Sequence, residues 1–407
     1  MKILLVHNAY TQPGGEEVVF EQERKLLERA GHQVSLYVRN NRDADQCSGL
    51  SRIRLAKQTV WSSGSKLDVA NLLQDRQPDL VHIHNTFMMI SPSIYWACKE
   101  AGVPVVQTLH NFRLYCPGIN FYRENRLCED CVQHSLWRAV RHGCYRQSHS
   151  ASAVVASMLA LHRRWHTWTN AIDCYIALTQ FARQKFIIAG LPANKIVVKP
   201  NFVDPDPGIG DGDRQYAIFV GRLSPEKGIE TLISAWKALP VSIPLHIIGE
   251  GPYRTSLEEA NCGSAMKLYG RVSHEETLAA IKGAQFLILP SQCYENCPLS
   301  IIEAFACGTP VLCSRLGAMQ EIVADGRTGL HFAPGDPIDL ALKAHWAWSH
   351  FDELAAMGRR ARDEYKSRYA AAENYSMLMD IYGYVVDKAE LRSQIGWARA
   401  HPSRFSE

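Results

Sequence analysis

The sequence of 407 residues lacks any long, uninterrupted apolar run, although 46% of its residues are hydrophobic. Because a helix needs about 20 consecutive apolar residues to span a bilayer, no membrane-spanning segment is expected. The first ten residues, MKILLVHNAY, hold too short an apolar segment for a secretory signal and are typical of a first strand. We therefore expect a cytoplasmic protein whose twelve cysteines are reduced thiols or metal ligands rather than disulfides.

Two further signatures are incomplete or lacking. The turn GEGP begins like a dinucleotide-binding fingerprint with Gly249 and Gly251, but Arg254 occupies the place of the third glycine. Asp-x-Asp does not follow any expected strand, so no pair of carboxylates is placed there to hold a divalent metal ion. A dinucleotide cofactor and a catalytic metal ion are therefore not expected.

Charge is distributed unevenly between the two halves of the sequence. Residues 1–200 carry nine more basic than acidic side chains, whereas residues 201–407 carry six more acidic than basic ones. This asymmetry favours a first half that faces an anionic partner, which could be nucleic acid, an anionic membrane surface or a phosphate-bearing acceptor. The alternative is incidental surface charge.

The order of apolar runs and helix-like stretches predicts an α/β protein of two or three domains. Strands are expected at residues 2–7, 34–38, 80–84, 103–109, 174–178 and 196–199, and again at 216–220, 245–248, 266–269, 285–289 and 309–313. The stretch PNFVDPDPGIGDGDRQ is rich in proline and glycine, which places a domain boundary near Asn201. In doubly wound parallel sheets, ligands bind beyond the carboxyl ends of the strands.

The stretch from Ser291 to Cys313 predicts a helix start that binds an anion. Pro298 suits the first helical position, and Gly308 suits the residue after the last turn. The free backbone N–H groups of the first turn favour a phosphate. Glu295 in the preceding loop and Glu303 in the second turn could then accept hydrogen bonds from sugar hydroxyls. Alternatively, both glutamates are simply solvated.

Three more candidates follow expected strands. In GRLSPEKG, Arg222 and Lys227 could clasp phosphate oxygens, unless they are a surface pair. Gly14 and Gly15 would let backbone approach a phosphate or sugar closely, although such a pair is often only a turn. His110 ends the fourth strand and is either functional or a hydrogen-bonded structural histidine.

These motifs together resemble those of glycosyltransferase family 4 over most of the chain. The glutamate pair is followed by AFACGTPV, PGGEE matches a Gly-Gly-x-Glu loop through Glu17, and GRLSPEKG matches the family's Arg and Lys. Glu321–Val323 and Gly326–Gly329 match further pieces, but Ala318 stands where the family has glycine. The resemblance implies the GT-B fold, in which two Rossmann-like domains face each other across a cleft. It also implies retaining transfer that needs no metal ion.

The resemblance assigns roles to particular residues. It places Glu295 and His110 at the reacting sugar, Glu303 on the ribose, and Arg222 and Lys227 on the donor diphosphate. The other implied donor-binding residues are Gly14, Gly15, Arg271, Val272, Asn296, Pro298, Leu299 and Ser300. It further implies a first domain at residues 1–200 that binds the acceptor, a donor domain at 201–380, and a segment at 381–407 that returns to the first domain. Residues 374–388 are the candidate crossing helix.

Residues 116–144 form a cysteine-bearing insert in the first domain. Cys116, Cys128, Cys131 and Cys144 could hold a tetrahedral metal ion such as zinc, because the middle pair has the spacing CxxC. The other interpretation is four reduced thiols. A metal here would have a structural role and would shape the acceptor site.

Two stretches favour contact with a membrane. Residues 52–66 and 158–168 combine basic side chains with tryptophan and leucine, which suits the headgroup region. Core-facing amphipathic helices have the same composition, so this alternative stays open. The sequence thus predicts a cytoplasmic glycosyltransferase of polysaccharide biosynthesis that moves a sugar from a nucleotide donor to a glycan or lipid-linked acceptor. These two stretches add the option of peripheral contact with the inner face of the membrane. Another GT-B enzyme (an epimerase or phosphorylase) is the alternative, and a nucleic-acid-binding protein is disfavoured.

Overall fold

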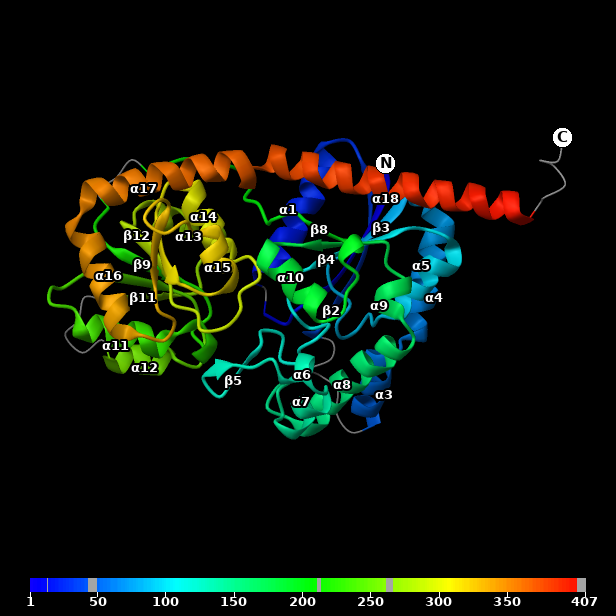
Figure 1. Cartoon of the computed structure of the whole chain (residues 1–407), viewed down its shortest axis with the longest axis horizontal. Helices are drawn as coiled ribbons and strands as arrows, with labels where there is room; N and C mark the ends of the chain where they lie inside the picture. The colour runs from blue at the N-terminus through cyan, green and yellow to red at the C-terminus, as the bar shows by residue number, and fades with distance from the viewer. Residues whose placement is uncertain (13, 43–49, 211–213, 261–265, 401–407) are drawn as a thin grey trace.

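The computed structural model describes residues 1–12, 14–42, 50–210, 214–260 and 266–400. It has two lobes joined by a single long helix along one side (Figure 1). Each lobe contains a six-stranded sheet in which every pairing is parallel. The predicted α/β class with two doubly wound domains is therefore what the structure contains.

The first lobe has the strand order β2-β1-β3-β4-β7-β8. These strands are β1 (Lys2–Ala9), β2 (Gln33–Asn40), β3 (Leu80–Ile83), β4 (Val105–Leu109), β7 (Cys174–Ala177) and β8 (Ile196–Val198). The helices of this lobe are α1 (Gly15–Arg29), α3 (Leu50–Val60), α4 (Ser63–Arg76), α5 (Ser93–Ala101), α8 (His149–Arg164), α9 (Thr167–Asn170) and α10 (Gln180–Ile188). Strands β1, β3, β4 and β7 are buried over almost their whole length, as expected when helices cover both faces of a parallel sheet.

The second lobe has the strand order β11-β10-β9-β12-β13-β14. These strands are β9 (Ala217–Val220), β10 (Leu245–Ile248), β11 (Met266–Gly270), β12 (Phe286–Leu289), β13 (Val311–Ser314) and β14 (Gly329–Phe332). The helices of this lobe are the short 3-10 turn η2 (Pro225–Lys227), α11 (Ile229–Ala238), α12 (Arg254–Ala260), α13 (His274–Lys282), α14 (Leu299–Ala306), α15 (Gly317–Ile322), α16 (Pro337–Ser349) and α17 (Phe351–Glu364).

One element position differs from the prediction by a residue. Pro298 was expected at the first helical position, but it is the N-cap of α14, and the helix begins at Leu299. Its backbone is extended (ψ 117°), which fits a residue that precedes a helix. At the other end Gly308 follows the cap with φ +66°, as predicted for the residue that ends the helix.

Helix α18 (Ala371–Ala400) returns from the second lobe to the first and runs along its back (Figure 1). Leu378, Ile381 and Tyr382 are buried in one apolar cluster with Ile3 and Leu5 of β1. The contact starts earlier, because the Asn374 side chain donates a hydrogen bond to the Pro200 carbonyl at 2.7 Å. The returning segment thus contacts the first lobe from Asn374 onward, within the range assigned above to the second domain.

The insert between β4 and α8 contains small elements that periodicity did not predict. They are β5 (Tyr122–Arg123), β6 (Arg126–Leu127), α6 (Asp130–Gln133) and α7 (Trp137–Arg141). Strands of two residues and helices of four or five are too short to show a period in the sequence. The insert lies at one side of the first lobe, where β5 extends toward the second lobe (Figure 1) and Tyr122 Oη lies 3.4 Å from Gln292 Oε1.

Candidate active site

The candidate residues lie on loops that follow the switch-point strands of the two sheets. In the first sheet, successive connections run in opposite directions from β1, because β2 lies on one side of it and β3 on the other. In the second sheet, β9 holds the same position between β10 and β12. Loops at the carboxyl ends of such strands form the binding crevice of α/β proteins. The loops after β1, β4, β9 and β12 carry most of the predicted site.

The loop after β12 also reaches the first lobe. The Asn296 amide donates a hydrogen bond to the Leu109 carbonyl, and its backbone carbonyl accepts one from Thr179 Oγ1 at 3.1 Å. Asn296 is buried. Asn296, which was predicted to bind the donor, is thus also the residue that fixes the loop against the end of β4. The same loop is held at Cys297, whose carbonyl accepts from Asn201 Nδ2 at 2.9 Å.

The starts of α1 and α14 face each other across the cleft. A Cβ atom added to Gly15 would lie 3.7 Å from Leu299 Cβ, so the two helix starts are in van der Waals range. Leu299 and Ser300 begin α14, and Gly14 is the N-cap of α1. Two helix N-termini that converge in this way concentrate partial positive charge at one point. The arrangement suits an anion such as a diphosphate.

Lys227 and Glu295 form an ion pair at this point, with Nζ 2.6 Å from Oε1. The same oxygen accepts a hydrogen bond from Ser291 Oγ at 2.7 Å. Burial disfavours the charged ammonium, but the neighbouring Glu295 carboxylate outweighs it and raises the pKa of Lys227. The lysine is therefore cationic at neutral pH. Both side chains retain some exposure, 25% for Lys227 and 13% for Glu295, so a ligand could reach them.

Arg222 differs from Lys227 in its exposure and in its contacts. Its side chain is exposed, and among the described residues it makes no hydrogen bond or ion pair. The turn that carries both residues requires glycine at Gly228, where φ is +71° and a Cβ would lie 1.9 Å from the Pro290 carbonyl oxygen. This close approach sets η2 directly against the end of β12.

Glu303 lies buried in the second turn of α14. Burial raises the pKa of its carboxyl group to about 7. His274 Nδ1 lies 3.4 Å from Oε1. Sequence reasoning assigned Arg271 and Val272 to this region, of which the first is exposed and the second partly buried. Sequence reasoning did not single out His274, the first residue of α13. The only local sign of this helix start was the Ser-x-x-Glu capping box around His274.

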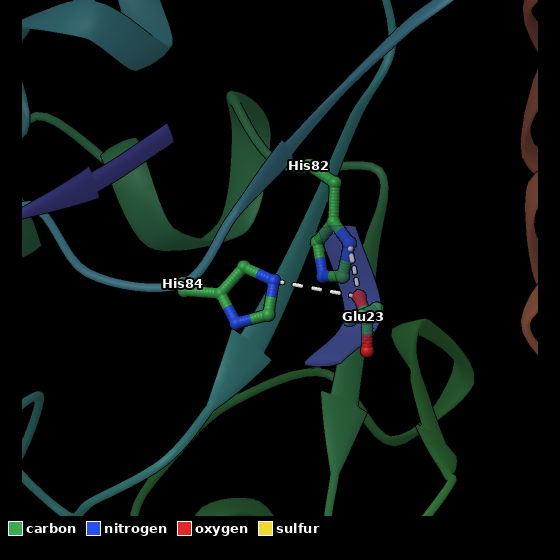
Figure 2. Close-up of side chains that lie close together, drawn as sticks. All are labelled: Glu23, His82 and His84. Carbon is green, nitrogen blue, oxygen red and sulfur yellow. Dashed lines mark ion pairs between the residues drawn. The ribbon is translucent and has the colours of Figure 1, made fainter. Parts of the chain in front are cut away.

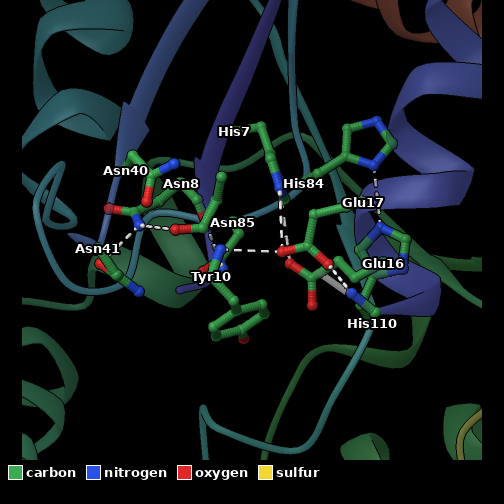
Figure 3. A network of polar contacts seen from close by, with 12 residues as sticks. His7, Asn8, Tyr10, Glu16, Glu17, Asn40, Asn41, His84, Asn85 and His110 are labelled. Atoms are coloured by element: carbon green, nitrogen blue, oxygen red, sulfur yellow. Dashed lines mark hydrogen bonds and ion pairs between the residues drawn. The ribbon is translucent and has the colours of Figure 1, made fainter. Parts of the chain in front are cut away.

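His110 contacts a second histidine that the sequence did not single out. His110 Nε2 and His84 Nδ1 are 2.9 Å apart, and the two rings stack with centroids 5.1 Å apart (Figure 3). Burial, and next the neighbouring His84 and His7, hold the pKa of His110 well below its ordinary value. A neutral imidazole at this strand end can donate or accept one hydrogen bond toward the cleft.

The loop and helix after β1 add acidic residues to the same region (Figure 3). The Glu17 carboxylate accepts hydrogen bonds from the backbone N–H groups of Tyr10 and Gly14, at 2.9 and 2.8 Å, and so holds the glycine loop in place. Glu16 is more deeply placed, with Oε2 3.3 Å from Asn111 Nδ2. Burial, and next Glu17, raise the pKa of Glu16 well above its ordinary value. A glutamate with a raised pKa beside the glycine loop was not foreseen.

Glu23, His82, His84 and Lys199 form a fully buried polar cluster, of which Figure 2 shows Glu23, His82 and His84. Glu23 Oε1 is 2.9 Å from His82 Nδ1 and 3.4 Å from His84 Nε2. Within the described residues, this triad is the one whose potential ligand atoms lie within 4.8 Å of one another. Lys199 Nζ, however, lies 3.1 Å from Glu23 Oε2. The ammonium already neutralises the carboxylate, so a metal ion would meet a like charge there.

The four cysteines of the insert lie near one another, and all are free thiols. Burial, and next Cys144 and Cys128, raise the pKa of Cys116 to about 11. Burial, and next Cys116 and Cys144, raise the pKa of Cys131 to about 12. Each sulfur is thus within electrostatic range of the others, although no three sulfurs in the described chain come within 4.8 Å of one another.

The two basic stretches differ in what they expose. In residues 158–168, Met158, Leu159 and Trp168 are buried in the first lobe's core, while Trp165 is 40% exposed. In residues 52–66 the arginines are exposed together with Ile53. Trp137 of α7 is a further exposed aromatic side chain near α8. Across the described ranges, every helix is too short or too polar to cross a bilayer.

Comparison with family models matches nearly the whole chain. A model described as Glycosyltransferase Family 4 matches residues 13–207, and one described as Glycosyl transferases group 1 matches residues 206–364. A GDP-mannose-dependent α-(1-6)-phosphatidylinositol dimannoside mannosyltransferase of Mycobacterium tuberculosis is 31% identical over 79% of this chain and 82% of its own length. The Arabidopsis thaliana sulfoquinovosyl transferase is 24% identical over 71% of this chain. The chain spans 53% of the length of that plant protein.

Solved structures share the same architecture. Anabaena HepE, determined in complex with UDP and glucose, superposes with a TM-score of 0.67 over 94% of this chain and 100% of its own, at 19% identity. Sucrose-phosphate synthase from Thermosynechococcus elongatus gives a TM-score of 0.71 over 95% of this chain and 99% of its own, at 18% identity. At these identities the likeness concerns the fold.

Proposed function

The chain belongs to glycosyltransferase family 4, and we propose that it moves a hexose, with retention, from a nucleoside-diphosphate sugar to a glycan or lipid-linked acceptor, without a metal ion. The observation that carries this proposal is the Lys227–Glu295 pair beside the facing starts of α1 and α14. The pair offers a cation for phosphate and a carboxylate for a sugar hydroxyl within 2.6 Å of each other. A nucleotide sugar needs both chemistries side by side.

The donor would bind with its diphosphate at the paired helix starts. Lys227 would turn from Glu295 toward the phosphate, and exposed Arg222 would close over the same oxygens. Glu295 would then accept from a hydroxyl of the donor sugar. Glu303 would accept from the ribose once it is ionised, and Arg271 with Val272 would flank the base.

The transfer would follow a front-face course. The acceptor oxygen forms a bond to the anomeric carbon as the bond from that carbon to the phosphate oxygen breaks. The bonding electrons pass to the departing diphosphate, which takes the acceptor's proton. Lys227, Arg222 and the helix starts stabilise the charge that develops on the diphosphate, which is commonly the largest catalytic contribution. Neutral His110 would orient a hydroxyl of the sugar next to the reacting carbon.

The acceptor is proposed to be anionic and membrane-associated. A groove of about 660 Å³ borders the insert and is lined by Arg123, Arg126, Arg138 and Arg141. Four guanidinium groups around one groove suit a phosphate-bearing acceptor. Exposed Ile53, Trp137 and Trp165 with nearby arginines would hold the protein on the inner face of the membrane. Flotation with neutral and anionic vesicles tests this contact, and equal binding to both would contradict the role of charge.

Turnover with defined donors tests the reaction. UDP-glucose and GDP-mannose, which correspond to the ligands and donors named for the relatives, are screened first by the shift of the melting temperature. Nuclear magnetic resonance then reports the anomeric configuration of the product. We expect retention and unchanged rates in EDTA. Lys227→Ala and Arg222→Ala should remove most turnover, while the surface control Arg254→Ala should not.

The same assays separate other GT-B activities. An epimerase would return an altered donor without an acceptor, and a phosphorylase would require inorganic phosphate. Inverted product, or full activity in both the Lys227 and the Arg222 variant, would overturn the proposed mechanism.

A further inference from the structure

The four cysteines of the insert, here called the cysteine cluster (Cys116, Cys128, Cys131 and Cys144), are linked by backbone contacts within the insert. Phe121 accepts a hydrogen bond from the Cys128 N–H at 2.7 Å, and the Cys116 carbonyl accepts one from the Ile119 N–H at 2.8 Å. Cys131, three residues after Cys128, lies in the first turn of α6. These contacts hold the first three cysteines in one region of the insert.

The fourth cysteine is held by α7. The Ala139 carbonyl accepts a hydrogen bond from the Cys144 N–H at 3.0 Å. Gly118 brings Cys144 next to Cys116, because a Cβ added there would lie 3.7 Å from Cys116 Sγ and 3.5 Å from the Cys144 carbonyl oxygen. The cluster is thus built by the fold and is not a chance gathering of surface thiols.

We propose that the cysteine cluster binds one zinc ion through four thiolates and that this ion holds the insert in shape. Zinc takes four sulfurs at about 2.3 Å in a tetrahedron, which corresponds to about 3.8 Å between sulfurs. No three of these sulfurs lie within 4.8 Å of one another among the described residues, so the side chains would have to turn about their Cα–Cβ bonds to take up this arrangement. All four thiols are free, so no disulfide competes for them in this conformation.

The insert needs such a link because its own elements are small. Its strands have two residues each and its helices four and five. Elements of this size do not hold together by themselves, and small units of this kind are commonly stabilised by a metal ion. Zinc binding would also fix the neighbouring Glu129, which accepts a hydrogen bond from Tyr294 at 3.0 Å across the cleft. The ion would in this way set the position of the loop that carries Glu295.

Metal analysis of the full chain, purified without chelator, tests the site directly. We expect about one equivalent of zinc in the wild type. The variants Cys128→Ala and Cys131→Ala should contain less than a fifth of that amount. The matched control Cys98→Ala, in a buried helix outside the cluster, should keep the metal. Cobalt added to the zinc-free protein should give the absorption of tetrahedral thiolate coordination.

Limited trypsin digestion gives a second readout that does not depend on the variants. The insert contains several arginines, of which Arg126, Arg138 and Arg141 are exposed. Removal of zinc by a strong chelator should increase the rate of cleavage in residues 116–148 by at least tenfold, and added zinc should restore resistance. Less than a tenth of an equivalent of zinc in the wild type, iron in its place, disulfides among the four cysteines, or unchanged cleavage after chelation would each overturn the proposal.

Discussion

Two lysine–glutamate pairs occupy the two lobes, and their surroundings differ sharply. In the first lobe Lys199 Nζ lies 3.1 Å from Glu23, and both side chains are at most 2% exposed. In the second lobe Lys227 Nζ lies 2.6 Å from Glu295, and both side chains keep contact with solvent. The chemical groups are the same, so the difference in what they do must come from their neighbours.

The first pair is closed on every side. Lys199 Nζ also donates to Asn374 Oδ1 at 2.9 Å, and Glu23 faces two histidines. The lysine belongs to the linker end of the lobe and Asn374 to the returning helix α18, so the pair joins three distant segments. Glu295 of the second pair has two further donors, Ser291 Oγ at 2.7 Å and the Cys293 thiol at 4.0 Å, and both members of the pair keep some exposure. The comparison teaches that a fully buried pair fixes the fold, whereas a partly exposed pair can exchange its partner for a ligand.

The largest expected effect comes from breaking the closed pair. Lys199→Met leaves the Glu23 carboxylate buried without its cation, which should lower the free energy of unfolding by about 3–5 kcal/mol. Calorimetry of the first thermal transition measures it. The double variant Glu23→Gln with Lys199→Met should recover part of the loss. A melting temperature equal to that of the wild type would contradict the structural role of this pair.

The matched substitution in the open pair should affect turnover instead. Lys227→Met is expected to lower kcat by about 10²–10³-fold, because it removes a cation that acts on the departing diphosphate. The melting temperature should change little, since Lys227 is partly exposed. Steady-state kinetics and thermal melts on one preparation make the test. If Lys199→Met and Lys227→Met lost similar amounts of stability, the two pairs would not differ in role.

The carboxyl group of Glu303 gives a pH-dependent contrast with Glu23. Burial raises the pKa of Glu303 to about 7 in the folded protein, above its unfolded value near 4.5. The folded state then holds more protons than the unfolded state between these values, so this contribution to stability is full below pH 4.5 and is lost as the pH rises to about 7. Glu303→Gln should therefore be more stable than the wild type at pH 8, by up to about 3 kcal/mol, and similar at pH 4.5. Melts across this range check the prediction, and a constant difference would refute it.

The smallest expected effect concerns the support of Glu295. Ser291→Ala removes one hydrogen bond of 2.7 Å to its carboxylate, which is worth about 1 kcal/mol. Activity should fall about fivefold with little change in stability. Kinetics of this variant beside Thr179→Ala, which loses a buried hydrogen bond between the lobes, separate support of the carboxylate from support of the loop.

Sequence reasoning succeeded where function and local pattern coincide. The strands were visible as apolar runs, the GT-B architecture and the family followed from spaced motifs, and both are confirmed. Lys227 and Glu295 were each singled out, but their direct pairing was not, because they are 68 residues apart and meet only when β9 and β12 lie side by side.

The closed pair could not be found in this way. Glu23 sits in an ordinary amphipathic helix and Lys199 at the end of a strand, 176 residues away. The histidines His82 and His84 alternate along an apolar strand end and give no local sign that one contacts Tyr382 and the other His110. Contacts of this range are set by topology, which composition and periodicity do not encode.

The position of helix α18 at the end of the sequence affects the order in which the two lobes can finish folding. The face of the first sheet that includes Ile3 and Leu5 is covered by Leu378 and Tyr382, and His82 Nδ1 meets the Tyr382 hydroxyl at 2.6 Å. On the ribosome, the part of this face that Leu378 and Tyr382 cover therefore stays exposed until the entire second lobe has been translated, although Phe20 and Leu27 of α1 can already pack beside it. The lobe that is synthesised first would thus be the last to be completed, and a chain interrupted before residue 371 would leave it exposed to aggregation.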